Sequence, residues 1–196
     1  MRIIISYFVI FSIICFVNEG QAELKKGDRM TLLKIDKGEF CNADESDLEV
    51  SLSKDKPAEN KKFCVKVSIT KESKRPFIFI LTYDSNLLKG KRGVWSGFDK
   101  LKIEYFSTSK NPIETELNIG DEIAYSRWSA KKQCVRKVTI LPGHNILSVD
   151  IRSLERTFFP GEFLDMNNIR GCFLKSDNLT NEDWIFYIQD VYLEKE

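Results

Sequence analysis

From residue 23 to the end of the chain, short segments alternate large apolar residues with polar ones, and this period of two most constrains the fold. In residues 100–107 (KLKIEYFS), Leu101, Ile103 and Tyr105 fall on one side of an extended strand, and the residues between them fall on the other. This alternation predicts strands that bury one face against a core.

About ten segments have this character, each rich in Ile, Val, Phe and Tyr and bounded by Gly, Pro, Asn, Asp or Lys. They are residues 31–40, 48–53, 62–69, 76–83, 100–107, 113–121, 134–141, 146–154, 169–176 and 185–194. The best helical candidate, residues 149–159 (VDIRSLERTFF), starts with β-branched residues and is interpreted as a strand that runs into a turn. Short strands separated by polar turns predict an all-β fold, either a two-sheet sandwich or a barrel.

The N-terminus has the pattern of a secretory signal peptide. A basic residue precedes an apolar run over residues 3–17, and Gly20 and Ala22 are small residues at the −3 and −1 positions of a cleavage site. The run is shorter than the roughly 20 residues of a membrane span, and no second hydrophobic segment follows. We expect a cleaved signal over residues 1–22, then one domain over residues 23–196 without a transmembrane segment. The expected location is secreted, periplasmic or cell-surface.

The charge balance excludes one class of partner. The chain has 30 basic and 29 acidic residues and a formal net charge of +1. Nucleic-acid-binding domains carry a clear excess of positive charge, so no nucleic-acid partner is expected.

Export also decides how the cysteines are interpreted. Of the five, Cys15 leaves with the signal, and Cys41, Cys64, Cys134 and Cys172 remain. An even number in an oxidising compartment predicts two disulfides, with all three pairings open. The alternative is that some of these residues are buried thiols within strands. Their spacing has no CxxC or Cys/His cluster, which argues against structural zinc.

Several motifs follow one another in a fixed order. They are residues 95–101 (WSGFDKL), the Asn111-Pro112 turn, the turn at residues 142–145 (PGHN) before the strand with Val149, Ile151 and Leu154, and residues 187–193 (YIQDVYL). Over residues 31–194 this order resembles the β-jelly-roll carbohydrate-binding modules of the galactose-binding-domain-like superfamily, which also includes the complex-I intermediate-associated proteins. The resemblance implies an antiparallel two-sheet β-sandwich (jelly roll). Trp95 and Trp184 are then interpreted as core residues.

Catalytic machinery is sparse in the sequence. The single histidine, His144, lies in a turn motif, which disfavours a Ser/His/Asp triad or a His-rich metal centre. The segment Glu45-Ser46-Asp47-Leu48-Glu49 has the E-x-D-x-E spacing of jelly-roll β-glucanases, which alternation places on one sheet face. In that family the intervening residues are both apolar, whereas Ser46 is polar, so a glycan hydrolase is the least favoured hypothesis.

Aromatic and polar residues gather instead in the segment DEIAYSRWSAKKQ. Tyr125, Arg127 and Trp128 lie there in an expected hairpin-like turn, where a large ring has no evident core to fill. Aromatic rings stack on the C–H faces of sugars and polar side chains bind their hydroxyls, so these residues form the predicted ligand site, with Asn86 and Arg92 as a neighbouring wall. The alternative for Trp128 is that its ring folds over a sheet edge.

The resemblance also implies a structural calcium ion between the first and last strands. The matching ligand positions are Asp36, Glu39 and Asp190. Hard oxygen ligands of this kind suit calcium. Gln189 stands where the family pattern has a second acidic residue, so ordinary exposed acids are the alternative.

Together these features predict a secreted, non-catalytic, lectin-like module whose partner is a glycan or glycoconjugate. A protein-interaction or assembly module on the same fold is the second hypothesis, since a fold alone does not assign a function.

Overall fold

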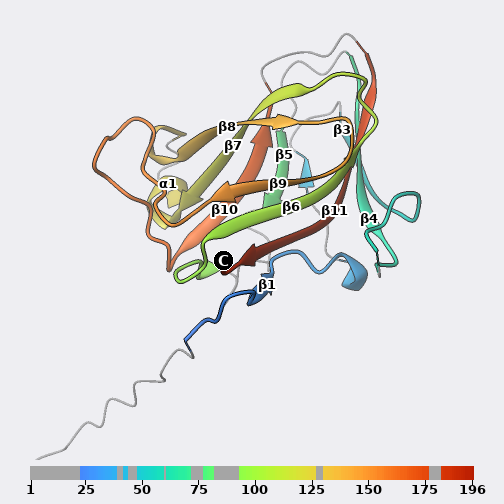
Figure 1. Ribbon diagram of the computed structural model, residues 1–196. Helices are drawn as coiled ribbons and strands as arrows, with labels where there is room; N and C mark the ends of the chain where they lie inside the picture. The colour runs from blue at the N-terminus through green and yellow to red at the C-terminus, as the bar shows by residue number, and fades with distance from the viewer. Residues whose placement is uncertain are drawn as a thin grey trace, which may run out of the picture.

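The computed structural model describes residues 23–38, 42–43, 48–59, 61–71, 77–81, 93–126, 130–176 and 182–196 (Figure 1). The predicted signal peptide lies outside these residues, as does Cys41. Within the described part of the chain, no helix is long and apolar enough to cross a membrane.

Two antiparallel sheets of six and five strands form a sandwich, which confirms the expected fold class. The first sheet has the order β3 (Leu48–Ser53), β4 (Cys64–Ile69), β11 (Trp184–Glu194), β6 (Lys100–Ser107) and β9 (Gly143–Asp150), and β1 (Arg29–Thr31) also pairs with β11. The second sheet has the order β2 (Asn42–Ala43), β5 (Phe77–Leu81), β10 (Ile169–Lys175), β7 (Ile113–Asp121) and β8 (Cys134–Ile140).

The alternation of β6 takes the predicted form. Leu101, Ile103 and Tyr105 are buried between the sheets, and the residues between them are partly exposed on the outer face. The Tyr105 hydroxyl accepts a hydrogen bond from the backbone N–H of Leu141 at 2.9 Å. This bond ties the connection between β8 and β9 to β6, an inner strand of the first sheet.

The last strand, β11, lies at the centre of the first sheet between β4 and β6. A register shift between Ile188 and Asp190 inserts one extra residue, Gln189. Because of this bulge, both Ile188 and Val191 face the core, although three positions separate them. The strand therefore contributes apolar side chains to the core along its whole length.

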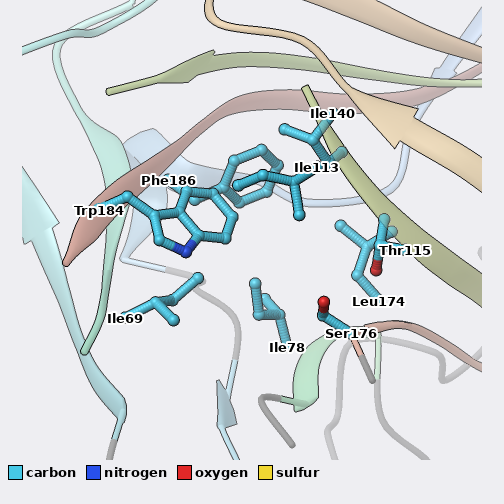
Figure 2. Close-up of a pocket in the computed structure, with 9 residues that line it drawn as sticks. All are labelled: Ile69, Ile78, Ile113, Thr115, Ile140, Leu174, Ser176, Trp184 and Phe186. Carbon is cyan, nitrogen blue, oxygen red and sulfur yellow. The ribbon is translucent and has the colours of Figure 1, made fainter. Parts of the chain in front are cut away.

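The core itself contains both tryptophans that were expected to be structural. Trp95 is 0% exposed and Trp184 is 5% exposed. Figure 2 shows Trp184 and Phe186 beside isoleucines from both sheets, with the hydroxyls of Thr115 and Ser176 on one side. The gap between these side chains has a volume of about 10 Å³, which is room for one water molecule at most. It is a packing gap and not a ligand site.

The predicted two-disulfide framework is wrong for the cysteines that the structure describes, among which no disulfide forms. Ile119 of β7 is the cross-strand partner of both Cys172 on β10 and Cys134 on β8. The two cysteines are therefore separated by two strand spacings of about 4.8 Å each. That separation exceeds the roughly 7 Å between Cα atoms that a disulfide can bridge. Cys64 lies in the other sheet, and its Sγ donates to the Ser53 carbonyl at 3.4 Å. The alternative of buried thiols describes these residues.

The strand expected at residues 31–40 is also wrong in part. β1 ends at Thr31, and a 3₁₀ helix, η1 (Ile35–Lys37), follows. Gly38 closes this helix with φ of 83°, a left-handed conformation that glycine adopts without strain. Leu32, Leu33 and Ile35 are all buried, so the apolar run packs as an irregular segment under the sandwich.

Candidate functional site

Three connecting segments meet at the end of the sandwich where β7 ends and β8 begins (Figure 1). One joins β7 to β8 and contains α1 (Glu122–Ser126) and η4 (Ala130–Lys132). The others are residues 151–168, between β9 and β10, and residues 93–99, before β6. Backbone hydrogen bonds join the three segments. The Trp95 N–H donates to the Met166 carbonyl at 2.6 Å, and the Glu122 N–H donates to the Asn168 carbonyl at 3.2 Å. The Thr157 N–H donates to the Gln133 carbonyl at 3.0 Å.

A buried ion pair organises this end. The side chains of Asp121 and Arg156 are 0% and 4% exposed, and Arg156 Nη2 donates to Asp121 Oδ2 at 2.7 Å. The same carboxylate accepts the backbone N–H groups of Ala124 at 3.1 Å and Asp165 at 2.9 Å. Burial by itself raises the pKa of Asp121, but the hydrogen bonds from Arg156, Asp165 and Ala124 outweigh it and hold the pKa below its ordinary value.

Arg156 also fixes the segment that carries the predicted ligand residues. Its Nη1 donates both to Asp121 Oδ1, at 3.2 Å, and to the Lys132 carbonyl, at 2.5 Å. The guanidinium therefore contacts both Asp121, the last residue of β7, and Lys132, the last residue of η4. The side chain of Tyr125, and the whole of Arg127 and Trp128, lie outside the described residues.

The segment connects two antiparallel paired strands, β7 and β8, as expected of a hairpin, but the connection begins with the short helix α1 instead of a turn. Asp121 Oδ1 accepts the N–H of Ala124, three residues ahead, in the manner of a helix N-cap. The sequence DEIA therefore starts a helical turn at the end of β7. Asn86 and Arg92, predicted as the neighbouring wall, lie outside the described residues.

Residues 154–164 form a hydrogen-bonded loop that projects at this end, drawn in orange in Figure 1. Glu155 and Phe163 form an isolated β-bridge across the loop. The N–H of Arg156 donates to the Glu162 carbonyl at 2.8 Å, and this arginine is anchored to Asp121 through its side chain. The loop backbone is thus braced across its width and fixed at its base.

The same loop displays aromatic rings. Phe158 is 62% exposed and Phe163 is 55% exposed. Phe159 is half-buried, with the Lys132 ammonium 3.7 Å from its ring centroid. Lys132 also forms an ion pair with Glu162 at 3.0 Å. Two exposed rings therefore lie on a loop that also carries charged hydrogen-bonding groups.

Sequence reasoning missed Phe158 and Phe163 as surface residues. The segment FFPGEF at residues 158–163 has a Pro-Gly turn within three phenylalanines, and the period of two fails there. That failure was the available signal, because aromatic residues next to a turn have no sheet face to join.

The predicted calcium ligands meet other partners. Asp36 Oδ1 accepts the backbone N–H groups of Lys62, at 3.0 Å, and Phe63, at 3.3 Å. Asp190 Oδ2 lies 3.4 Å from the Lys61 ammonium. The structure thus brings Asp36 and Asp190 to the same short segment, where N–H donors and an ammonium surround them, and this donor set does not fit a cation. Glu39 is outside the described residues, among which no group of three or more acidic, His or Cys side chains could hold a metal.

The residues weighed for catalysis do not converge in the described chain. His144 lies in β9 with its side chain 54% exposed, and its Nε2 is 3.2 Å from Glu104 Oε1. Glu49 is exposed on β3, while Glu45 and Asp47 are outside the described residues. The hydrolase hypothesis therefore stays untested.

Comparison of the sequence with protein-family models and with curated proteins finds no match. Comparison of the structure with solved structures finds a family 11 carbohydrate-binding module of the cellulosomal cellulase Lic26A-Cel5E of Clostridium thermocellum, with a TM-score of 0.58 and 15% identity over 88% of this chain and 97% of that one. A family 30 carbohydrate-binding module of the cellulosomal cellulase Cel9D-Cel44B of the same organism has a TM-score of 0.55 and 10% identity over 88% and 95%. The agarase AgWH50C matches with a TM-score of 0.54 and 13% identity over 87% of this chain and 25% of its own length.

These likenesses define the fold class. The chain has the jelly-roll fold of carbohydrate-binding modules over nearly all of its length, as the order of the sequence motifs indicated. Identities of 10% and 15% show a shared architecture, while function depends on the side chains at each site.

Proposed function

We propose that this protein is a secreted, non-catalytic carbohydrate-binding module that holds a glycan at the end of the sandwich formed by residues 93–99, 122–126, 130–133 and 151–168. The observation that carries this proposal is the pair of phenylalanines, Phe158 and Phe163, more than half exposed on a braced loop. The fold shared with solved carbohydrate-binding modules supports it.

The chemistry of this end suits a sugar. Exposed rings offer apolar faces to the C–H groups of a pyranose, and a backbone fixed in advance lowers the entropy lost on binding. Lys132 and Glu162 supply a donor and an acceptor for hydroxyl groups beside those rings. Tyr125, Arg127 and Trp128 belong to the same connection between β7 and β8 in the sequence, and they stay predicted ligand residues.

Binding assays with alanine variants test this function. Purified protein is titrated with a panel of polysaccharides by calorimetry, and Phe158→Ala and Phe163→Ala are each expected to weaken the affinity about tenfold, the scale of a stacked aromatic contact. Leu141→Ala is the matched control, because Leu141 is also exposed, at 44%, but lies in the β8–β9 connection at the other end of both strands. Unfolding temperatures of all variants should agree within a few degrees.

Two outcomes would replace the proposal. No saturable binding across the panel, together with a protein partner retained in the presence of competing sugars and lost in Phe158→Ala, would assign the same surface to protein interaction. Release of reducing sugar by wild type, abolished by Glu49→Gln, would make the protein a hydrolase. Secretion is tested separately by N-terminal sequencing of exported protein, which should begin at Glu23.

A further inference from the structure

A groove opens along one edge of the sandwich, beside the loop end described above. β8 is at one edge of the second sheet and β9 is at one edge of the first. The groove between them has a volume of about 570 Å³, and its lining includes Arg136, Lys137 and Val138 of β8, Val149 and Asp150 of β9, and Arg152.

Arg136 occupies a core-facing position but is exposed. It is paired with Leu117 of β7, which is fully buried, and directly paired residues project from the same face of a sheet. A strand that closed the core would carry an apolar residue here. The guanidinium instead reaches the far side of the groove, where Nη2 donates to the Ser153 carbonyl at 3.3 Å.

Arg152 is held in place by the carboxylate of Asp150, which also lines the groove. Arg152 Nε donates to Asp150 Oδ1 at 3.1 Å, its Nη2 contacts Oδ2, and its backbone N–H donates to Oδ1 at 3.1 Å. Lys100 lies 3.4 Å from the same carboxylate. These contacts hold the pKa of Asp150 well below its ordinary value, so it is ionised and neutralised by two cations.

The charge of the lining is therefore positive. Among the described lining residues, Arg136, Lys137 and Arg152 stand against a single carboxylate, Asp150, which is already paired. Acids outside the lining also lie nearby: Asp99 is 3.3 Å from Lys195, and Glu196 is 3.6 Å from both Lys100 and Lys102. Glu116 is the cross-strand partner of Lys137 and lies 3.8 Å from Lys175. Each of these acids has at least one lysine within ion-pair distance, and Glu196 shares Lys100 with Asp150.

We propose that this groove binds the anionic groups, carboxylate or sulfate, of an acidic glycan. The two guanidiniums are held by contacts within the protein, and each has further N–H donors in the planar arrangement that matches carboxylate and sulfate oxygens. Val138 and Val149 give the groove apolar lining against which the sugar rings can lie. Ser153 connects the groove to the loop with Phe158, so one chain of sugars could contact both. This specificity rests on the proposed carbohydrate function.

The test compares glycans that differ only in charge. Oligogalacturonate and its fully methyl-esterified form make one pair of probes, and dextran sulfate and dextran make the other. Wild type, Arg136→Gln and Arg152→Gln are titrated at low and high salt, with Lys62→Gln as the charge-matched control, because exposed Lys62 lies by β4, away from the β9 edge.

Either acidic probe is expected to bind wild type more tightly than its neutral partner. Each arginine variant should weaken that binding about tenfold, while Lys62→Gln should not, and high salt should remove most of the difference. Tighter binding of oligogalacturonate would identify the ligand group as carboxylate, and tighter binding of dextran sulfate would identify it as sulfate. Equal affinity for charged and neutral probes, or unchanged affinity in both arginine variants, would overturn the groove site and leave Arg136 as an inward charge that protects an edge strand.

The same variants distinguish failure of the groove site from failure of the proposed carbohydrate site at the aromatic end. If Phe158→Ala leaves all binding intact while Arg136→Gln abolishes binding of the acidic probe, the groove stands and the aromatic end is wrong. If no probe binds a protein that still unfolds cooperatively, both proposals fall.

Discussion

Removing the buried carboxylate of Asp121 should be among the most damaging single changes at this end of the protein. In Asp121→Asn the side chain keeps its size but loses its charge, so the buried guanidinium of Arg156 keeps only the exposed Glu162 carboxylate, 3.7 Å from its Nε, as a counter-ion. Both carboxylate oxygens accept hydrogen bonds in the wild-type protein. The amide replaces one of these oxygens with an NH₂ donor, so the groups that donate to that oxygen lose their acceptor. Breaking one partner of a buried pair costs about 3–5 kcal/mol. For a domain of this size that lowers the unfolding temperature by about 10 °C.

Urea unfolding followed by tryptophan fluorescence measures this loss, since Trp95 and Trp184 are buried and report on the core. Glu162→Gln is the matched control, because it removes an exposed carboxylate that pairs with Lys132 at 3.0 Å and lies 3.7 Å from Arg156 Nε. Ion pairs with an exposed partner contribute little, so this change should cost less than about 1 kcal/mol. A double variant, Asp121→Leu with Arg156→Leu, should be less damaged than Asp121→Asn, because no charge is left buried.

The effect should also depend on pH with a defined sign. The pKa of Asp121 is lower in the folded protein than the value of about 3.9 in an unfolded chain. The ionised carboxylate therefore stabilises the fold fully above pH of about 4, and this contribution is lost as the pH falls through the folded pKa. The stability gap between wild type and Asp121→Asn should narrow in acid. A gap no larger than that of Glu162→Gln, or one that is constant from neutral pH to acid, would refute the role assigned to the pair.

Two further predictions concern the cysteines and calcium. Burial raises the pKa of Cys64 and Cys134, so both thiols should resist a thiol reagent in folded protein and react on unfolding, as peptide mass spectrometry would show; modification of the native protein would contradict this. Calcium should leave the unfolding temperature unchanged, because the Lys61 ammonium and backbone N–H groups already satisfy Asp190 and Asp36. A rise that Asp190→Asn abolishes would instead establish a calcium site.

The sequence predicted much of the fold because strand periodicity is a local property. The alternation in residues 100–107 identified both the strand and its buried face, and the motif order correctly indicated a jelly roll. Trp95 was correctly assigned to the core. The failures came where the period is broken: residues 31–40 pack as an irregular buried segment, and the segment after Asp121 begins with a helix.

The candidate site was much less predictable. The sequence drew attention to Trp128, which lies outside the described residues, but not to Phe158 or Phe163. Exposure of an aromatic ring depends on what packs over it, and no local pattern encodes that. The buried pair of Asp121 and Arg156 joins residues 35 positions apart and was likewise invisible.

The sequence by itself determined that the chain forms strands, which side of each is apolar, and hence that the strands enclose a core as a sandwich or a barrel. Only the tertiary structure decided which strands neighbour one another. That choice left Cys134 and Cys172 two strands apart, and it placed β8 at an edge, where Arg136 could occupy an inward position. The physical reason is that a period of two specifies the face of a residue, whereas its partners depend on pairing between distant segments.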